Sequence, residues 1–171
     1  MLANKNLPNV ITIARMIGTA VLLFLRPLSP LFLVVYTLTG VSDALDGFLA
    51  RKYGTASELG ARLDSIADML FYLVSLVKVA PILWEKMPRA IWFAVGAVLL
   101  VRLSSYVVCA VKYHHFASLH TYLNKATGLM VFGVVYVLST SAIVPYGWIV
   151  CVIGMLSSLE ELVEHITSKK E

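Results

Sequence analysis

The sequence contains few charged residues for its length, and this scarcity excludes most classes of soluble protein. Asp, Glu, Lys and Arg make up 14% of the 171 residues, whereas apolar residues make up 59%. Soluble domains carry about 25% charged and about 45–50% apolar residues. No polar stretch is longer than a loop, so no soluble domain can be separated from the rest. The composition therefore indicates an integral membrane protein with a single domain over residues 1–171.

Cysteine and histidine are also scarce, which weighs against a disulfide framework and a zinc site. Cys109 and Cys151 both lie within apolar runs, where a buried thiol is more common than a disulfide or a metal pair. His114, His115 and His120 gather in a polar loop without a cysteine, which favours a solvated or headgroup-facing loop. The net charge of +4, with Lys and Arg at the ends of apolar runs, suits lipid headgroups rather than nucleic acid.

Six apolar segments are candidates for helices that cross a membrane, which requires about 20 largely apolar residues each. We place them at 10–25, 31–51 (beginning at 30 or 31), 60–83, 89–111, 121–140 and 143–167. The connections are short and contain helix breakers. We therefore predict an all-α integral membrane fold, a bundle of six transmembrane helices, after an amphipathic lead-in at about residues 1–9. The C-terminal stretch EELVEHITSKKE is interpreted as the solvated end of the last helix.

Lysine and arginine are distributed unequally between the two sides of this predicted bundle. The side that carries the N-terminus holds Lys5, Arg51, Lys52, Arg62, Lys112, Lys169 and Lys170. The opposite side holds Arg26, Lys86 and Arg89. Because cytoplasmic loops carry the excess of positive residues, both termini and the 51–60 loop are predicted to face the cytoplasm.

Four aspartates lie near the facing ends of the second and third predicted helices. At 100° per residue, one polar face of the second helix falls within an arc of about 140°. That face consists of Asp43, Asp46, Gly47, Ala50 and Arg51. Gly60, Asp64 and Asp68 are four residues apart and share one face of the third helix. Because helices joined by a short loop are antiparallel neighbours, the two acidic faces are expected to meet.

Carboxylates gathered in a low-dielectric setting repel one another, so they either hold protons or bind cations. Hard oxygen ligands without His or Cys nearby favour Mg²⁺, Mn²⁺ or Ca²⁺ over zinc. Gly47 and Gly60 leave room for a ligand on these faces, and Arg51 is placed to hold a phosphate. The combination indicates phosphoryl chemistry on a lipid nucleotide. One alternative is that these charges only mark the ends of the spans. Another is a cation transport site, although transporters often contain an internal repeat and this sequence shows none.

These residues carry a resemblance to a known family. The pattern Asp-x2-Asp-Gly-x2-Ala-Arg-x8-Gly-x3-Asp-x3-Asp is matched without a gap from Asp43 to Asp68. It resembles the signature of the CDP-alcohol phosphotransferases, also called CDP-alcohol phosphatidyltransferases. The opening NLPNVITIAR is similar to the start of bacterial phosphatidylglycerophosphate synthases, which often read N-x-P-N-x-L/I-T-x-x-R. That similarity implies a protein of the bacterial cytoplasmic membrane.

The resemblance implies transfer of a phosphatidyl group from CDP-diacylglycerol to a small alcohol, or of a phospho-base from a CDP-alcohol to a lipid. CMP is released, usually by a homodimer of six-span chains. Two divalent ions, Mg²⁺ or Mn²⁺, would be held by Asp43, Asp46, Asp64 and Asp68. Asp68 would also be the catalytic general base. The residues at the family's CDP-binding positions are Gly47, Arg51, Ser57 and Gly60, with Asn9 and Thr12 as further candidates.

Two cations further along the chain suggest the acceptor alcohol. Arg102 lies well inside the fourth segment and Lys125 near the start of the fifth, and neither has an obvious acidic partner in the sequence. Lys112 is expected to reach lipid headgroups. The stretch LNKATGLM is loosely similar to the Lys-x-Lys-Thr-x-x-Gln-Met region of phosphatidylglycerophosphate synthases, with Lys125 on the second lysine. We predict a phosphorylated acceptor, glycerol 3-phosphate ahead of inositol phosphate. If both side chains point away, inositol or serine is favoured.

Overall fold

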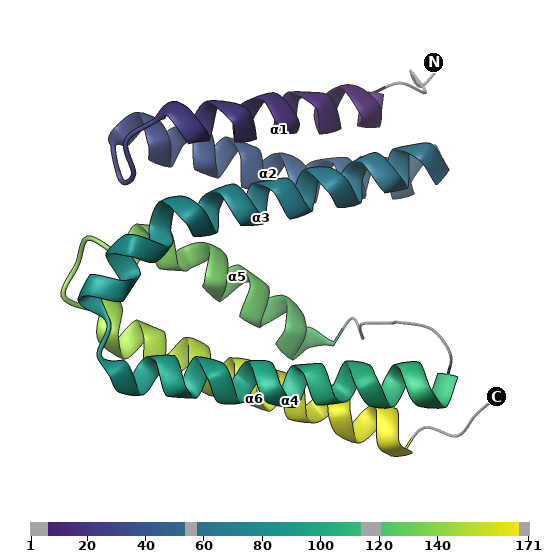
Figure 1. Ribbon diagram of the computed structural model, residues 1–171. Coiled ribbons are helices and arrows are strands. Elements are labelled where there is room, and N and C mark those ends of the chain that lie inside the picture. Colours follow the sequence, from purple (N-terminus) through teal and green to yellow (C-terminus); the bar gives the residue numbers. More distant parts are fainter. Residues whose placement is uncertain (1–6, 54–57, 114–120, 168–171) are drawn as a thin grey trace. The chain divides into compact units, whose positions relative to one another are not determined.

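The computed structural model describes the backbone of residues 7–53, 58–113 and 121–167, and the side chains of residues 10–42, 63–112 and 121–167. These ranges contain six helices and no strand: α1 (Leu7–Phe24), α2 (Pro30–Tyr53), α3 (Glu58–Lys86), α4 (Arg89–Tyr113), α5 (Tyr122–Val137) and α6 (Ile143–Thr167) (Figure 1). The six predicted segments match these helices to within a few residues at each end. The lead-in predicted at about residues 1–9 stays a prediction, because residues 1–6 lie outside the described ranges and α1 begins at Leu7.

Local sequence signals explain where two of the helices begin. Pro30 is the first residue of α2, a position where the missing N–H of proline costs nothing. Ser29 precedes it, and its hydroxyl accepts a hydrogen bond from the Phe32 N–H at 3.2 Å. At α5 the Thr121 hydroxyl accepts from the Asn124 N–H, also at 3.2 Å. Both side chains satisfy amide groups that a helix start leaves without a partner.

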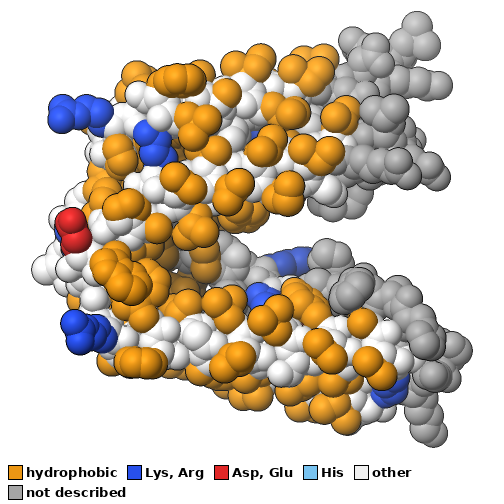
Figure 2. Space-filling model, in the orientation of Figure 1, with side chains coloured by type: hydrophobic (Ala, Val, Ile, Leu, Met, Phe, Trp, Pro, Cys, Tyr) orange, Lys and Arg blue, Asp and Glu red, His pale blue; other side chains and the backbone are white. Residues whose placement is uncertain are grey.

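Within the described residues three helical segments are long and apolar enough to cross a membrane: Leu63–Lys86, Arg89–Lys112 and Ile143–Thr167. Three shorter apolar segments lie in the remaining helices: Val10–Phe24, Pro30–Ser42 and Tyr122–Val137. Large hydrophobic side chains cover the visible faces of the helices (Figure 2). Phe93, for example, is 80% exposed and Val111 is 72% exposed, as expected for groups that face lipid. The chain is therefore an all-helical integral membrane protein, and six complete crossings remain a prediction.

The chain forms two compact units, Met1–Ile82 and Leu83–Glu171, which we call the N-terminal unit and the C-terminal unit. In the N-terminal unit α1 packs on α2. Gly18 permits this approach, because a Cβ atom there would lie 2.6 Å from Oγ1 of Thr39. The Tyr36 ring of α2 stacks on the Phe71 ring of α3 with centroids 5.2 Å apart. These contacts connect the helices that carry the aspartate motif. The prediction of a single domain remains a prediction.

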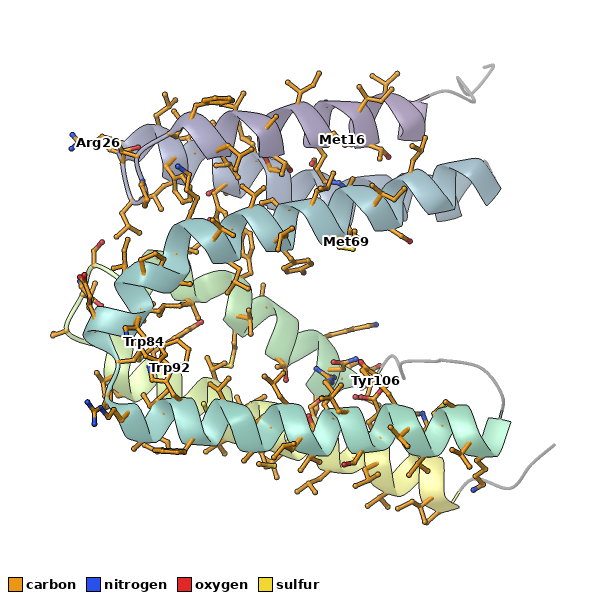
Figure 3. The ribbon with its side chains drawn as sticks, viewed as in Figure 1. Met16, Arg26, Met69, Trp84, Trp92 and Tyr106 are labelled. Carbon is orange, nitrogen blue, oxygen red and sulfur yellow. The ribbon has the colours of Figure 1, made fainter. Side chains whose placement is uncertain are left out.

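In the C-terminal unit α6 packs on both α4 and α5. The last turn of α3 belongs to this unit, and its Trp84 lies against Trp92 of α4 with ring centroids 5.0 Å apart (Figure 3). The Tyr146 hydroxyl of α6 donates to the Met130 carbonyl of α5 at 2.8 Å. Gly133 has no side chain that would collide with that hydroxyl. The glycine at this position thus serves helix packing.

Three lysines stabilise helix C-termini by donating to backbone carbonyls of another helix. Lys78 donates to Leu25 at the end of α1, at 2.9 Å. Lys86 donates to the Leu138 carbonyl at the end of α5, at 2.8 Å. Lys112 donates to the last carbonyls of α6, at 3.0 Å to His165 and 2.7 Å to Ile166. A positive charge is favourable there because the helix dipole leaves negative potential at the C-terminus. The expectation that Lys112 reaches lipid headgroups stays a prediction, and the contacts with α6 add a role in capping that helix.

Candidate active site

The aspartate motif occupies the end of α2 and the beginning of α3. Asp43, Asp46 and Arg51 fall in the last turns of α2, with Gly47 between them. Gly60, Asp64 and Asp68 fall in the first three turns of α3. The predicted helical periodicity therefore holds for both parts of the motif. Of these side chains, those of Asp64 and Asp68 lie in the described part of the structure, and Ser57 lies outside the described residues altogether.

The carboxylates of Asp64 and Asp68 converge on one cation, Arg15 of α1. Nη2 of Arg15 donates to Oδ1 of Asp64, and Nη1 lies 3.2 Å from Oδ1 of Asp68. Nη2 also donates to the backbone carbonyl of Asp64 at 3.3 Å. The Arg15 side chain is 1% exposed, whereas those of Asp64 and Asp68 are 40% and 35% exposed. The carboxylates therefore bind an internal positive charge while remaining accessible from outside.

Arg15 is a site residue that the sequence analysis missed, although the sequence contains a signal for it. Thr12, Arg15 and Thr19 are all buried, at 4%, 2% and 3% exposure, within an otherwise apolar helix. Their spacing of three and four residues places them on one face of α1. The Thr19 hydroxyl donates to the Arg15 carbonyl at 2.9 Å, within the helix. A polar stripe in an apolar span indicates an inward face with a polar partner.

The burial of Thr12 on this face is compatible with its predicted place in the CDP pocket, and the side chain of Asn9 is outside the described residues.

The residues present fit a hard divalent cation. Two carboxylates on successive turns of α3 already share a single positive group, so a cation at that point would have at least two oxygen ligands. No group of three or more His, Cys, Asp and Glu side chains occurs among the residues that were described. The remaining predicted ligands, Asp43 and Asp46, lie on α2 with side chains outside that range. The full ligand set is therefore a prediction.

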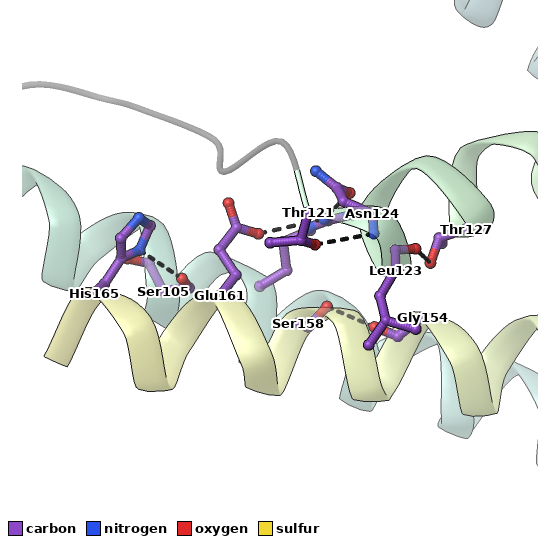
Figure 4. A network of polar contacts seen from close by, with 10 residues as sticks. Ser105, Thr121, Leu123, Asn124, Thr127, Gly154, Ser158, Glu161 and His165 are labelled. Carbon is purple, nitrogen blue, oxygen red and sulfur yellow. Dashed lines mark hydrogen bonds and ion pairs between the residues drawn. The ribbon is translucent and has the colours of Figure 1, made fainter. Parts of the chain in front are cut away.

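A second polar cluster lies inside the C-terminal unit, around Arg102 of α4. Nη2 of Arg102 donates to Oδ1 of Asn124 on α5 at 2.5 Å and lies 3.3 Å from Oε2 of Glu161 on α6. Figure 4 shows these two partners, Asn124 and Glu161. The Glu161 side chain is only 2% exposed. The expectation that Arg102 lacks an acidic partner is therefore wrong. The partner lies 59 residues later in the chain, so nothing in the local sequence reveals it.

The same face of α6 carries a buried histidine. Nδ1 of His165 lies 2.9 Å from the Ser105 hydroxyl and 3.2 Å from the Ser105 carbonyl of α4. His165 and Glu161 are four residues apart and both turn toward the helices that α6 packs on. The interpretation of this C-terminal stretch as a solvated end is therefore wrong for Glu161 and His165, whereas Glu160 and Glu164 are exposed. Leu159, Val163 and Ile166 are exposed here while the polar pair is buried, so the signal in the sequence was the four-residue spacing of Glu161 and His165.

Among the described contacts, none joins Lys125 to Arg102. Lys125 is exposed, and its Nζ atom lies 5.9 Å from the centroid of the Tyr122 ring on the same helix. Lys125 follows Asn124 directly in the chain, but it does not belong to the polar cluster around Arg102. His114, His115 and His120 lie outside the described residues. Cys109 and Cys151 are buried and form no disulfide, as predicted.

Removing the charge partner of Arg102 is expected to destabilise the C-terminal unit. Glu161→Ala leaves the guanidinium of a partly buried arginine without its carboxylate, so we expect a loss of about 2 kcal/mol in unfolding free energy. Glu160→Ala is the matched control, because Glu160 is the exposed neighbour on the same helix. Thermal unfolding of the two variants in detergent measures the difference. Equal unfolding temperatures would show that the ion pair contributes nothing.

Comparison with known proteins identifies a matching family model and several relatives of this chain. A sequence model of the CDP-alcohol phosphatidyltransferase family matches residues 5–159. The chain is 42% identical over 80 residues to "Cardiolipin synthase (CMP-forming)" of Streptomyces coelicolor, which covers 42% of this chain and 37% of the relative. It is 40% identical over 80 residues to "CDP-diacylglycerol–glycerol-3-phosphate 3-phosphatidyltransferase" of Cereibacter sphaeroides, with 43% and 36% covered. A protein of the same name from Pseudomonas fluorescens is 35% identical over 94 residues, with 50% and 48% covered.

The chain thus spans between about a third and a half of the length of these curated relatives. The family match is broader, because it runs from the first helix into the sixth and includes the aspartate motif as well as Arg15, Arg102 and Asn124. It also agrees with the resemblance inferred from the motif. This chain belongs to the CDP-alcohol phosphatidyltransferase family.

Proposed function

We propose that this protein transfers a phosphatidyl group from CDP-diacylglycerol to glycerol 3-phosphate and releases CMP, as a step of phospholipid synthesis. The observation that carries the proposal is the pair of motif carboxylates, Asp64 and Asp68, held together around one positive charge. Two relatives named for this reaction support the choice of acceptor.

On the donor side, Asp43, Asp46 and Asp64 would hold two divalent ions, Mg²⁺ or Mn²⁺, with Asp68 beside them. When bound, such ions neutralise the pyrophosphate and stabilise the departing CMP. Gly47, Gly60, Arg51 and Ser57, together with Asn9 and Thr12, would hold the cytidine and pyrophosphate of the donor. Asp68 would accept the proton of the acceptor hydroxyl as its oxygen attacks the phosphorus of the phosphatidyl group.

A groove in the N-terminal unit supports a lipid donor. It has a volume of about 320 Å³ and lies between α1 and α2. Its walls are mostly apolar and include Val10, Val35 and Leu38, while Arg15 lies along it. An acyl chain in this groove would run past the residue that holds Asp64 and Asp68. The groove would thus place the glycerol end of the donor near the motif.

On the acceptor side, Arg102 supports a phosphorylated alcohol. Its Nε atom is buried and has no hydrogen-bond partner among the residues described, and only its Nη2 atom is used by Asn124 and Glu161. A phosphate oxygen would satisfy such donors with charge-assisted hydrogen bonds. Lys125 would reach the same phosphate only by turning away from Tyr122.

A second acceptor class is favoured by the same ion pair. Glu161 already neutralises much of the charge of Arg102, which weakens the need for a phosphate. An acceptor without a phosphate monoester, as inositol or serine would be, fits that observation. The relative from Streptomyces coelicolor is named for cardiolipin synthesis, which makes a lipid acceptor a further candidate. Inositol phosphate remains the phosphorylated alternative.

The proposal is tested with purified protein, CDP-diacylglycerol and a set of acceptors. We expect CMP release that requires Mg²⁺ or Mn²⁺ and is fastest with glycerol 3-phosphate, and a phosphatidylglycerophosphate product by mass spectrometry. Faster turnover with serine, inositol or a phosphatidylglycerol-containing vesicle would replace the acceptor. No CMP release with any acceptor would favour the alternative of a cation transport protein that has kept the motif.

Substitutions on the acceptor side should separate acceptor binding from donor binding. Arg102→Ala should raise the KM for glycerol 3-phosphate by about tenfold or more, because a charge-assisted pair contributes about 1.5–3 kcal/mol. Lys125→Ala should raise it less, because Lys125 is exposed. Donor KM should change little in either variant. An acceptor KM indifferent to both substitutions would exclude a phosphate site at Arg102.

The orientation in the membrane is also a proposal: both termini and residues 51–60, which include the end of α2 and the start of α3, face the cytoplasm. A cysteine placed at Ser57 should be protected from an impermeant thiol reagent added to intact cells, and Lys86→Cys should be labelled. The native thiols give a low background because Cys109 and Cys151 are buried. Labelling at position 57 with protection at position 86 would invert the topology.

We further propose a homodimer, which a crosslinking or mass measurement in detergent would test.

A further inference from the structure

Arg15 occupies the position where a cation would meet the aspartates of α3. Its guanidinium contacts Oδ1 of both Asp64 and Asp68, the oxygens that a metal at that point would take. The arginine comes from α1 and is almost completely buried, so the chain itself provides a fixed positive charge there. We propose that Arg15 is a built-in competitor for the cation, a positioning residue that holds Asp64 and Asp68 together until metal replaces it. This inference rests on the proposed function of the two aspartates as metal ligands.

The charges explain why the metal-free site needs such a group. Two carboxylates one turn apart repel each other when nothing positive lies between them. A planar guanidinium can bridge two carboxylates with separate N–H groups, as Nη1 and Nη2 do here. Arg15 therefore joins α1 to α3 at the motif and keeps both oxygens directed to one point. Arg15 is 2% exposed, and Thr12 and Thr19 on the same helix face are also buried, so the bridge forms away from bulk solvent.

The same contacts must oppose metal binding. A divalent ion that approaches Asp64 and Asp68 meets a positive charge within a few ångströms and has to take oxygens that Arg15 already uses. Arg15 thus lowers the free energy of the metal-free site and raises that of the metal-bound site. Both effects oppose metal binding. Replacing Arg15 with an uncharged residue should therefore increase metal affinity, even though it lowers the stability of the metal-free protein. A residue that only stabilised the fold would not have this signature.

Lys78 provides a matched control. It also joins α3 to α1, through its 2.9 Å hydrogen bond to the Leu25 carbonyl, and it also carries one positive charge. It lies 14 residues after Asp64 on the same helix, which is about 21 Å along the axis at 1.5 Å per residue. Its replacement should cost stability in a similar way without changing the charge at the aspartates.

The experiment compares Mn²⁺ binding by wild type, Arg15→Met and Lys78→Met in detergent, with free Mn²⁺ measured by electron paramagnetic resonance. We expect Arg15→Met to bind Mn²⁺ at least about tenfold more tightly than wild type and Lys78→Met to match wild type. Thermal unfolding without metal should be lower in both variants, and Mn²⁺ should raise it most in Arg15→Met. Affinity in Arg15→Met equal to or below that of wild type would overturn the proposal, and so would an equal gain in Lys78→Met.

Arg15→Lys keeps the test decisive if Arg15→Met does not fold. An ammonium group is a single point charge and cannot bridge two carboxylates as a guanidinium does. It should therefore compete less well, and Mn²⁺ affinity should rise above wild type by a smaller factor. An affinity no higher than wild type would overturn the proposal. A different result would contradict the proposed enzymatic function: the wild-type protein would bind Mn²⁺ but release no CMP.

Discussion

Replacing Asp68 with asparagine should reduce turnover by about 100-fold or more while donor binding stays within a few-fold of wild type. Loss of a general base typically costs about 10²–10⁴-fold. Asparagine keeps the shape of the side chain and one oxygen ligand but cannot accept the proton of the acceptor hydroxyl. The variant also loses one ion pair with Arg15, but Asp64 keeps the other. The fold should therefore survive the substitution.

The measurement is the rate of CMP release at saturating donor and acceptor, together with the donor KM. Glu85→Gln is the control, because it removes an exposed carboxylate from the opposite end of the same helix, α3. Glu85→Gln should turn over at the wild-type rate. Near-normal turnover in Asp68→Asn would remove Asp68 from the role of base. A parallel loss of donor binding would instead assign Asp68 mainly to the metal site.

Replacing Asp64 with asparagine should weaken metal and nucleotide binding together. Residues that only support metal ligands contribute about 10–100-fold to metal affinity, so loss of a direct ligand should cost at least that much. The nucleotide should follow, because its pyrophosphate is expected to bind through the metal. Asp43→Asn should behave in the same way if Asp43 supplies the facing ligand from α2. Turnover should fall below detection at metal concentrations that saturate wild type.

Binding of CDP to each variant, with and without Mg²⁺, measures this effect separately from catalysis. In wild type Mg²⁺ should increase CDP affinity strongly, and in Asp64→Asn the increase should largely disappear. The comparison is independent of the acceptor, so it holds whichever alcohol is the substrate. Normal Mg²⁺-dependent CDP binding in Asp64→Asn would show that the ligand assignment is wrong.

Much of the fold could be predicted from the sequence because its signals are local. The apolar runs give the six helices, and breakers such as Pro30 and caps such as Thr121 set where helices begin. Among the described residues three helical segments reach the length of a full span, and α5, with 16 residues, is shorter than the span that its apolar run predicts. The spacing of Asp64 and Asp68 placed them on one face of α3, since four residues make about one turn.

The errors in the sequence analysis all concern partners on different helices. Arg102 was expected to lack a carboxylate, yet Glu161 lies against it from α6. His165 was expected in solvent, yet it contacts Ser105 of α4. His165 lies near the end of an apolar run and Arg102 well inside one, and neither position tells from the sequence alone which residue of another helix will face it.

The sequence by itself determined that this is an all-helical membrane protein of the CDP-alcohol phosphatidyltransferase family, because composition, periodicity and motif spacing are properties of the chain alone. Only the tertiary structure decided which charges pair: Arg15 with Asp64 and Asp68, and Arg102 with Glu161. Helical periodicity fixes which residues share a face, but not how each helix is rotated or how deep it lies against its neighbours. That choice is made by packing, as where Gly18 lets α1 approach α2 and Tyr36 meets Phe71.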